Sequence, residues 1–150
     1  MLSPLTYANS IIKKALETKT PLSPMKLQKL MYLTYARYLF RQDAPLFAER
    51  FEKWRFGPVL SDVYDEFKGY KAQSIDDFYY NCDGKAPVVS TAFWEFYQCL
   101  DEVWSAFGCW DGISLSGLTH RPGTAWNKAT GIFLEEEDIR EDGKLLFAGT

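Results

Sequence analysis

Residues 23–41 read SPMKLQKLMYLTYARYLFR, and this stretch decides the fold. Its opening serine and proline are typical of a helix N-terminus, because serine caps free amides and proline loses nothing at the first helical position. From Met25 to Arg41, apolar side chains occur almost all round the helical wheel. A helix of that kind is buried on most sides, so we predict that it is the central helix of the domain.

The segments on either side repeat the helical period. The clearest is 90–107, where one face collects Phe93, Phe96, Tyr97, Leu100, Val103, Trp104 and Phe107. Further helices are predicted over 4–17, from Gly57-Pro58 to near Gly69, and over 113–119, 126–129 and 136–147. Residues 51–56 look extended, and 87–89 is a candidate partner strand. The expected fold is mainly α: a single compact helical domain over residues 1–150, with about six helices and at most a short two-stranded β element.

Composition narrows the class of protein. The net charge is −3, yet residues 1–55 hold ten Lys/Arg against four Asp/Glu, whereas 56–150 hold seven against sixteen. No apolar run reaches the roughly 18 residues of a membrane span, and the N-terminus lacks the pattern of a secretion signal. Three cysteines without C-x-x-C spacing suit reduced thiols. We therefore expect a cytoplasmic protein that does not contact a membrane.

Few residues suit catalysis or metal binding. His120 is the sole histidine, which excludes metal sites built from several histidines. A Cys–His pair of His120 with Cys82, Cys99 or Cys109 stays formally open, but no nucleophile motif surrounds any of the three. Neither G-x-x-x-x-G-K nor G-x-G-x-x-G occurs. We predict a protein that is not an enzyme and has no catalytic residue, metal ligand or cofactor.

One side of the predicted central helix mixes cations with large apolar groups: Lys26, Lys29, Leu33, Arg37, Phe40 and Arg41. Such a stripe can be a solvated face, can meet the acidic half of the same molecule, or can bind phosphates. Phosphate groups gain nothing from contact with exposed apolar side chains, whereas a protein partner can bury such side chains in its interface. These six residues are therefore our candidates for partner binding, and nucleic acid is the less favoured partner.

Three blocks of the sequence, taken in order, resemble one known family. They are MKLQKLMY (25–32), FGPV (56–59) followed by VYDEFK (63–68), and LSGLTH (115–120) with Trp126 six residues later. They are similar to the LQKLLY, YGPV…VYxEFK and LSxLTH…PW signatures of the Panacea domain, the SocA-like antitoxin family. The likeness extends over residues 20–147, with Ala125 where the family has proline and Phe56 where tyrosine is commoner.

The resemblance implies a mostly helical cytoplasmic antitoxin, encoded by bacteria or phages beside a small toxin. Members of the family are thought to neutralise toxins, many of them translation inhibitors, by direct binding, and some look like adaptors that deliver the toxin to a protease. We accordingly expect a cognate toxin from a neighbouring gene as the partner, with a protease as an alternative. The family-motif residues are expected to mark the fold: Leu27, Gln28, Leu30, Trp54, Gly57, Pro58, Tyr64, Phe67, Leu118, Thr119, His120 and Trp126.

Overall fold

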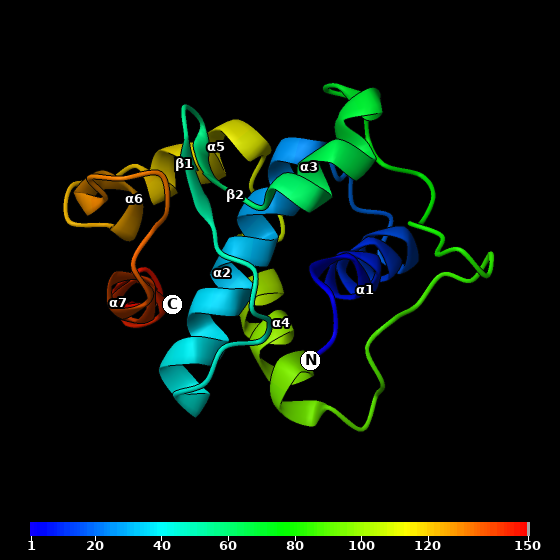
Figure 1. Cartoon of the computed structure of the whole chain (residues 1–150), viewed down its shortest axis with the longest axis horizontal. Coiled ribbons are helices and arrows are strands. Elements are labelled where there is room, and N and C mark those ends of the chain that lie inside the picture. Colours follow the sequence, from blue (N-terminus) through cyan, green and yellow to red (C-terminus); the bar gives the residue numbers. More distant parts are fainter. Residues whose placement is uncertain (150) are drawn as a thin grey trace.

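Helix α2 (Pro24–Gln42) passes through the middle of the molecule, and the other elements are arranged around it (Figure 1). It begins where the Ser23 hydroxyl accepts a hydrogen bond from the Lys26 amide. It ends at Asp43, whose left-handed φ of 54° stops the helical ladder. Twelve of its 19 residues are buried, which confirms the prediction of a central helix.

The computed structural model describes residues 1–149 and confirms the mainly α fold class. Its elements are α1 (Pro4–Glu17), α2, β1 (Glu52–Trp54), β2 (Gly57–Val59), α3 (Ser61–Phe67), the 3-10 helix η1 (Lys68–Tyr70), α4 (Trp94–Phe107), α5 (Gly112–Thr119), α6 (Ala125–Lys128) and α7 (Glu136–Leu145). Helix α4 begins four residues later than the predicted start at Ser90.

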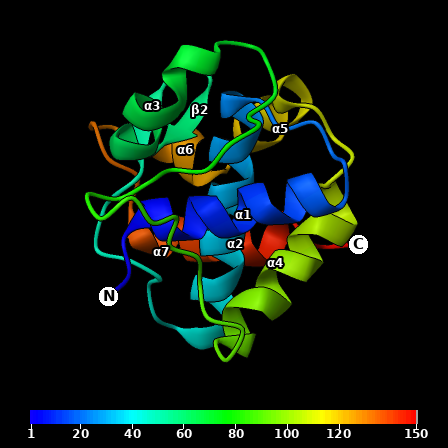
Figure 2. The ribbon, with the colours of Figure 1, turned by 90° about the vertical axis from the view of Figure 1, so that its right-hand side faces the viewer.

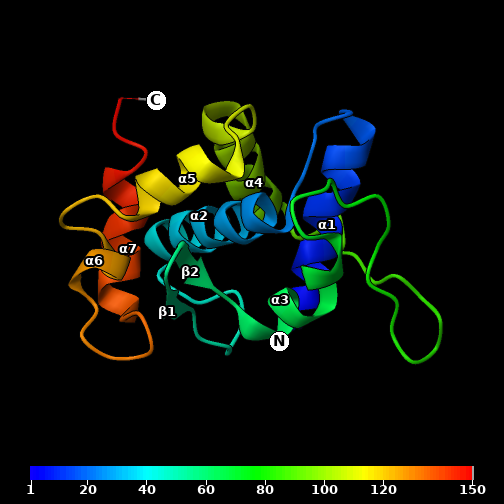
Figure 3. The ribbon, with the colours of Figure 1, turned by 90° about the horizontal axis from the view of Figure 1, so that it is seen from above.

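The packing around α2 explains why that helix is apolar on nearly every side. Helices α4, α5 and α7 contact it, and α1 and α3 approach it from another direction (Figure 2). Seen from above, α2 lies between α1 and α3 on one side and α6 and α7 on the other (Figure 3). No helix within residues 1–149 combines the length and the apolar composition needed to cross a membrane.

The two-stranded element is a local hairpin, so the predicted pairing of 51–56 with 87–89 is wrong. Strands β1 and β2 pair antiparallel, with Trp54 opposite Gly57 and a two-residue turn at Arg55-Phe56 between them. The predicted helix start at Gly57-Pro58 is also wrong, because these residues form β2 and α3 begins at Ser61. Gly57 does serve as the turn glycine, with a φ of +121° that other residues rarely adopt.

Residues 71–93 contain no helix or strand and are held instead by side chains of α1. The Asn9 amide donates to the carbonyls of Tyr79 (2.9 Å) and Pro87 (3.0 Å) and accepts from the Tyr79 amide. The Ser10 hydroxyl accepts from the Val89 amide at 2.8 Å. These bonds satisfy the main-chain groups that a strand at 87–89 would have given to a partner strand.

Candidate functional site

The structure rejects the expected exposed stripe on α2, because three of its six side chains are buried. Leu33 lies in the core, and Lys26 and Lys29 are 6% and 1% exposed. The Lys26 ammonium donates to the Gly108 carbonyl at 2.6 Å, and the Lys29 ammonium donates to the Pro58 carbonyl at 3.1 Å. In the folded chain these three residues hold elements together and do not form an exposed stripe on α2.

The other three stripe residues reach the surface, but the charges of Arg37 and Arg41 are paired within the molecule. Arg37 and Arg41 each bind Glu102 of α4, with nitrogen–oxygen distances of 2.6 Å. The Arg37 guanidinium also lies over the ring of Phe40, which is partly exposed. The basic and acidic parts of the sequence thus attract each other inside one fold at this place. A contact of these three residues with a partner stays a prediction.

The hairpin β1–β2 is fixed from three helices by side chains that bind its main chain. Four side chains donate hydrogen bonds to carbonyl groups of the hairpin. Trp126 Nε1 of α6 donates to Trp54 (2.6 Å), and His120 Nε2, directly after α5, donates to Arg55 (2.8 Å). Ser116 Oγ of α5 donates to Phe56 (2.6 Å), and Lys29 Nζ of α2 donates to Pro58 (3.1 Å). We call these four side chains the hairpin clamp. All of them fall in the family-like blocks of the sequence, and together they hold the turn in one position.

Two further contacts leave the hairpin little freedom. The Gln28 side chain forms a pair of hydrogen bonds with the main chain of Leu60, donating at 3.0 Å and accepting at 2.9 Å. Gly57 packs so closely on α2 that a Cβ there would lie 2.5 Å from Lys29 Cε and 2.9 Å from Thr119 Oγ1. The glycine therefore permits both the turn and the approach of the buried lysine.

His120 and Trp126 form one corner of the clamp. Their ring centroids are 3.9 Å apart, and the Lys53 ammonium lies 4.7 Å from the Trp126 ring centre. The second ring nitrogen of His120, Nδ1, hydrogen-bonds the Ser116 carbonyl near the end of α5. This imidazole therefore joins the end of α5 to the hairpin. Both side chains are half-buried, so each supports the turn without lying in the core.

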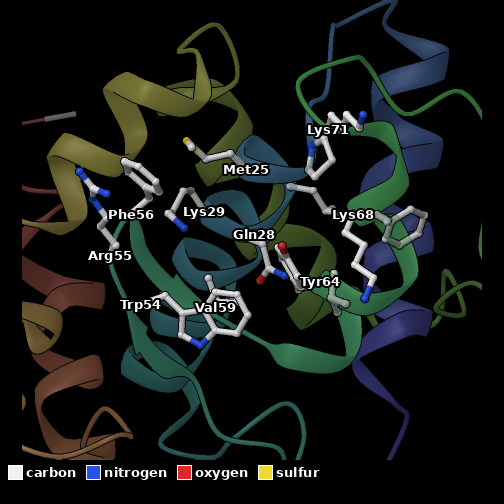
Figure 4. A pocket seen from close by; sticks show the side chains of 14 residues that line it. Met25, Gln28, Lys29, Trp54, Arg55, Phe56, Val59, Tyr64, Lys68 and Lys71 are labelled. Carbon is white, nitrogen blue, oxygen red and sulfur yellow. The ribbon is translucent and has the colours of Figure 1, made fainter.

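Beside the clamped turn lies an apolar hollow of about 500 Å³, which we call the hairpin groove. Figure 4 shows its lining: Pro24, Met25, Leu27, Gln28, Lys29, Trp54, Arg55, Phe56, Val59, Val63, Tyr64, Phe67, Lys68 and Lys71. Phe56 at the turn is 54% exposed, and Tyr64, whose ring packs 4.8 Å from that of Trp54, is 39% exposed. An open apolar hollow edged by exposed rings is suited to accept a side chain of another protein.

The electrostatics of the hairpin groove are one-sided. Arg55, Lys68 and Lys71 are exposed at its edge, Lys29 is buried at its floor, and no Asp or Glu lines it. Burial lowers the pKa of the Lys29 ammonium to about 7, because an apolar surrounding disfavours the charged form. Of the three edge cations, Lys68 has a nearby carboxylate, that of Asp65 at 3.5 Å. A negative group entering the groove would meet a positive potential.

The predicted motif residues divide between the core and this site. Leu27, Leu30, Phe67, Leu118 and Thr119 are buried in the core, and Leu27 and Phe67 also line the groove. The remaining motif residues belong to the hairpin, the clamp or the groove lining: Gln28, Trp54, Gly57, Pro58, Tyr64, His120 and Trp126. Reasoning from sequence missed the exposed groove residues Arg55, Phe56, Lys68 and Lys71. Their signal in the sequence was an aromatic residue next to the turn glycine, with cations at positions 55, 68 and 71 within or beside the second family-like block.

In the described part of the chain, the cysteines and acidic residues show no arrangement suited to a metal. Within residues 1–149, no group of three or more His, Cys, Asp or Glu side chains is placed to hold a metal ion. Cys99 is buried, and burial raises the pKa of its thiol to about 12, so it carries no thiolate at neutral pH. Cys82 and Cys109 are exposed.

Comparison with known proteins gives two matches. The profile of the family described as "Antitoxin SocA-like, Panacea domain" matches residues 27–127, which include the clamp and most of the groove. A protein named "Antitoxin SocA" from Caulobacter vibrioides (strain NA1000 / CB15N) is 29% identical over 124 residues. That match covers 80% of this chain, and the chain spans 66% of the length of the relative. No solved structure matches.

Proposed function

The chain belongs to the SocA-like antitoxin family defined by the Panacea domain, and from this premise we propose that it neutralises a cognate protein toxin by direct contact. The toxin is a translation or growth inhibitor made in the same cytoplasm and encoded by a neighbouring gene. The chain acts on it by occupying its surface rather than by chemistry.

The observation that carries this proposal is the clamped hairpin with an exposed ring at its tip. Phe56 is 54% exposed, while its own carbonyl and those of its neighbours are held by the clamp. A rigid loop loses little conformational entropy on binding, and an exposed aromatic side chain is the kind of anchor that supplies most of the affinity at protein interfaces. The hairpin tip and the hairpin groove together therefore form the proposed toxin-binding surface.

The test is a growth-rescue assay in which the toxin encoded beside this gene is expressed together with variants of the chain. We expect Phe56→Ser to lose protection and to lose co-purification with the toxin, because the anchor is removed while the clamp, which binds main-chain atoms, persists. The matched control is Trp94→Ser. Trp94 is 61% exposed at the start of α4, away from the hairpin, and its variant should protect like the wild type (Figure 1).

Thermal unfolding of both variants accompanies the assay, since only a folded protein can report on binding. Protection by folded Phe56→Ser at wild-type level would overturn the assignment of the surface. A wild-type chain that rescues growth without forming a complex with the toxin would overturn neutralisation by direct contact.

A further inference from the structure

The lining of the hairpin groove departs from the charge of the whole molecule. The chain has 20 Asp/Glu against 17 Lys/Arg, yet the groove is lined by four basic residues and no acidic one. Three of the four are exposed: Arg55 on the hairpin turn, and Lys68 and Lys71 at the two ends of η1 (Figure 4). An acidic chain that gathers only cations around its apolar hollow is complementary to a negatively charged occupant.

A neighbouring hollow of about 710 Å³ is lined by three lysines, Lys19, Lys26 and Lys71, and by the carboxylate of Asp111. Met25 and Lys71 line both hollows, so a chain that leaves the groove past them enters the second one. There it meets Lys19 and the side chain of Ile113, which is 79% exposed. Cations and apolar side chains thus occur together over a path longer than one side chain, which is long enough for an extended peptide segment.

The floor of the hairpin groove favours a peptide over a nucleic acid. It is formed by aliphatic side chains such as Leu27, Val59 and Val63. Single-stranded nucleic acids are bound by open aromatic faces on which bases stack. Here the Trp54 and Tyr64 rings pack against each other at an interplanar angle of 59°. The aliphatic surface therefore favours binding of apolar side chains, and the surrounding cations favour binding of carboxylates.

We propose that the hairpin groove selects an acidic segment of the toxin: an apolar side chain enters the hollow, and Asp or Glu side chains on either side of it pair with Arg55, Lys68 and Lys71. This inference rests on the proposed function and adds the chemical class of the segment that is recognised.

The experiment pans a phage-displayed library of random dodecapeptides against the purified chain. We expect enriched sequences in which Asp or Glu flanks a large apolar residue. A synthetic consensus peptide should bind the triple variant Arg55→Glu/Lys68→Glu/Lys71→Glu at least about tenfold more weakly than the wild type at low salt. The difference should shrink as salt rises, because exposed charges are screened.

The matched control reverses three other exposed lysines, in the variant Lys13→Glu/Lys85→Glu/Lys144→Glu. It makes the same change in net charge away from the groove, and it should bind the consensus peptide within about twofold of the wild type, since screening weakens distant charges. Fluorescently labelled oligouridylate serves as the nucleic-acid probe. We expect no oligouridylate binding that is lost in the triple variant of the groove and kept in the control variant.

Enrichment of neutral or basic peptides, no enrichment at all, or equal binding to the triple variant would each overturn the inference. Oligouridylate binding that the triple variant loses would assign the groove to nucleic acid instead. These failures differ from failure of the proposed function, because growth rescue that depends on Phe56 reports toxin binding whatever the charge of the segment bound.

Discussion

Lys29 offers the sharpest test of the structure, because a buried ammonium makes folding depend on pH. Its side chain is 1% exposed, and its pKa falls from 10.5 to about 7 through burial. Between these two values the unfolded chain keeps a proton that the folded chain releases. The free energy of unfolding therefore rises as the pH increases from about 7 towards 10.5, and this gain is lost when the pH is lowered back to 7.

The expected magnitude follows from the same two pKa values. One unit of difference corresponds to about 1.4 kcal/mol, so this lysine should raise the free energy of unfolding by about 2–3 kcal/mol between about pH 6.5 and about pH 9. The variant Lys29→Met keeps the length of the side chain and removes the titration. The difference in stability between the wild type and Lys29→Met should change by that amount across the window.

The assay is equilibrium unfolding in guanidinium chloride at several pH values, with Lys13→Met as the control. Lys13 is exposed on α1, so the difference between this control and the wild type should not vary with pH beyond a few tenths of a kcal/mol. A difference between wild type and Lys29→Met that stays constant from pH 6.5 to 9 would refute the burial of Lys29 as a lone cation.

Three other outcomes follow from the site and the core. Trp126→Phe removes the hydrogen bond to the Trp54 carbonyl and should cost about 1–2 kcal/mol in urea unfolding, whereas an unchanged midpoint would show that the corner is not clamped. Gly57→Ala should cost more, about 2–4 kcal/mol, because the new Cβ meets Lys29 and φ is +121°; wild-type stability would contradict the close approach. Burial raises the pKa of Asp142, which accepts a hydrogen bond from Tyr32, to about 6, so the folded chain holds a proton that the unfolded chain has released. Stability should then fall by about 2 kcal/mol from about pH 4 to about pH 6.5 relative to Asp142→Asn, and parallel pH profiles would contradict this.

The parts of the fold that depend on local signals were predicted from sequence. Helix α2 starts at its serine–proline signal, and α6 starts where the Thr124 hydroxyl accepts from the Asn127 amide. The apolar face of α4 is buried as its period indicates. Capping and periodicity act within a few residues, so a single sequence carries them.

The errors came from contacts that are distant in sequence. Lysine normally indicates a solvated face, but Lys26 reaches the Gly108 carbonyl 82 residues away, which no local pattern reports. Gly57-Pro58 looks like a helix start because proline suits that position, but in the structure these residues form β2, and side chains of α2, α5 and α6 that are distant in sequence hold the hairpin. The hairpin groove was missed for the same reason, since it needs α2, the hairpin and α3 to be placed together.

The hairpin clamp also has a consequence for how this surface can change. Its four side chains bind carbonyl oxygens, which every amino acid provides, and none of these bonds involves the side chains of Arg55 or Phe56. Residues at the tip can therefore be exchanged without loss of the bonds that position them. The loop is held in the manner of a variable loop on a constant scaffold, which separates the conditions for folding from the choice of partner. A library randomised at positions 55 and 56 would retain the fold while sampling new specificities.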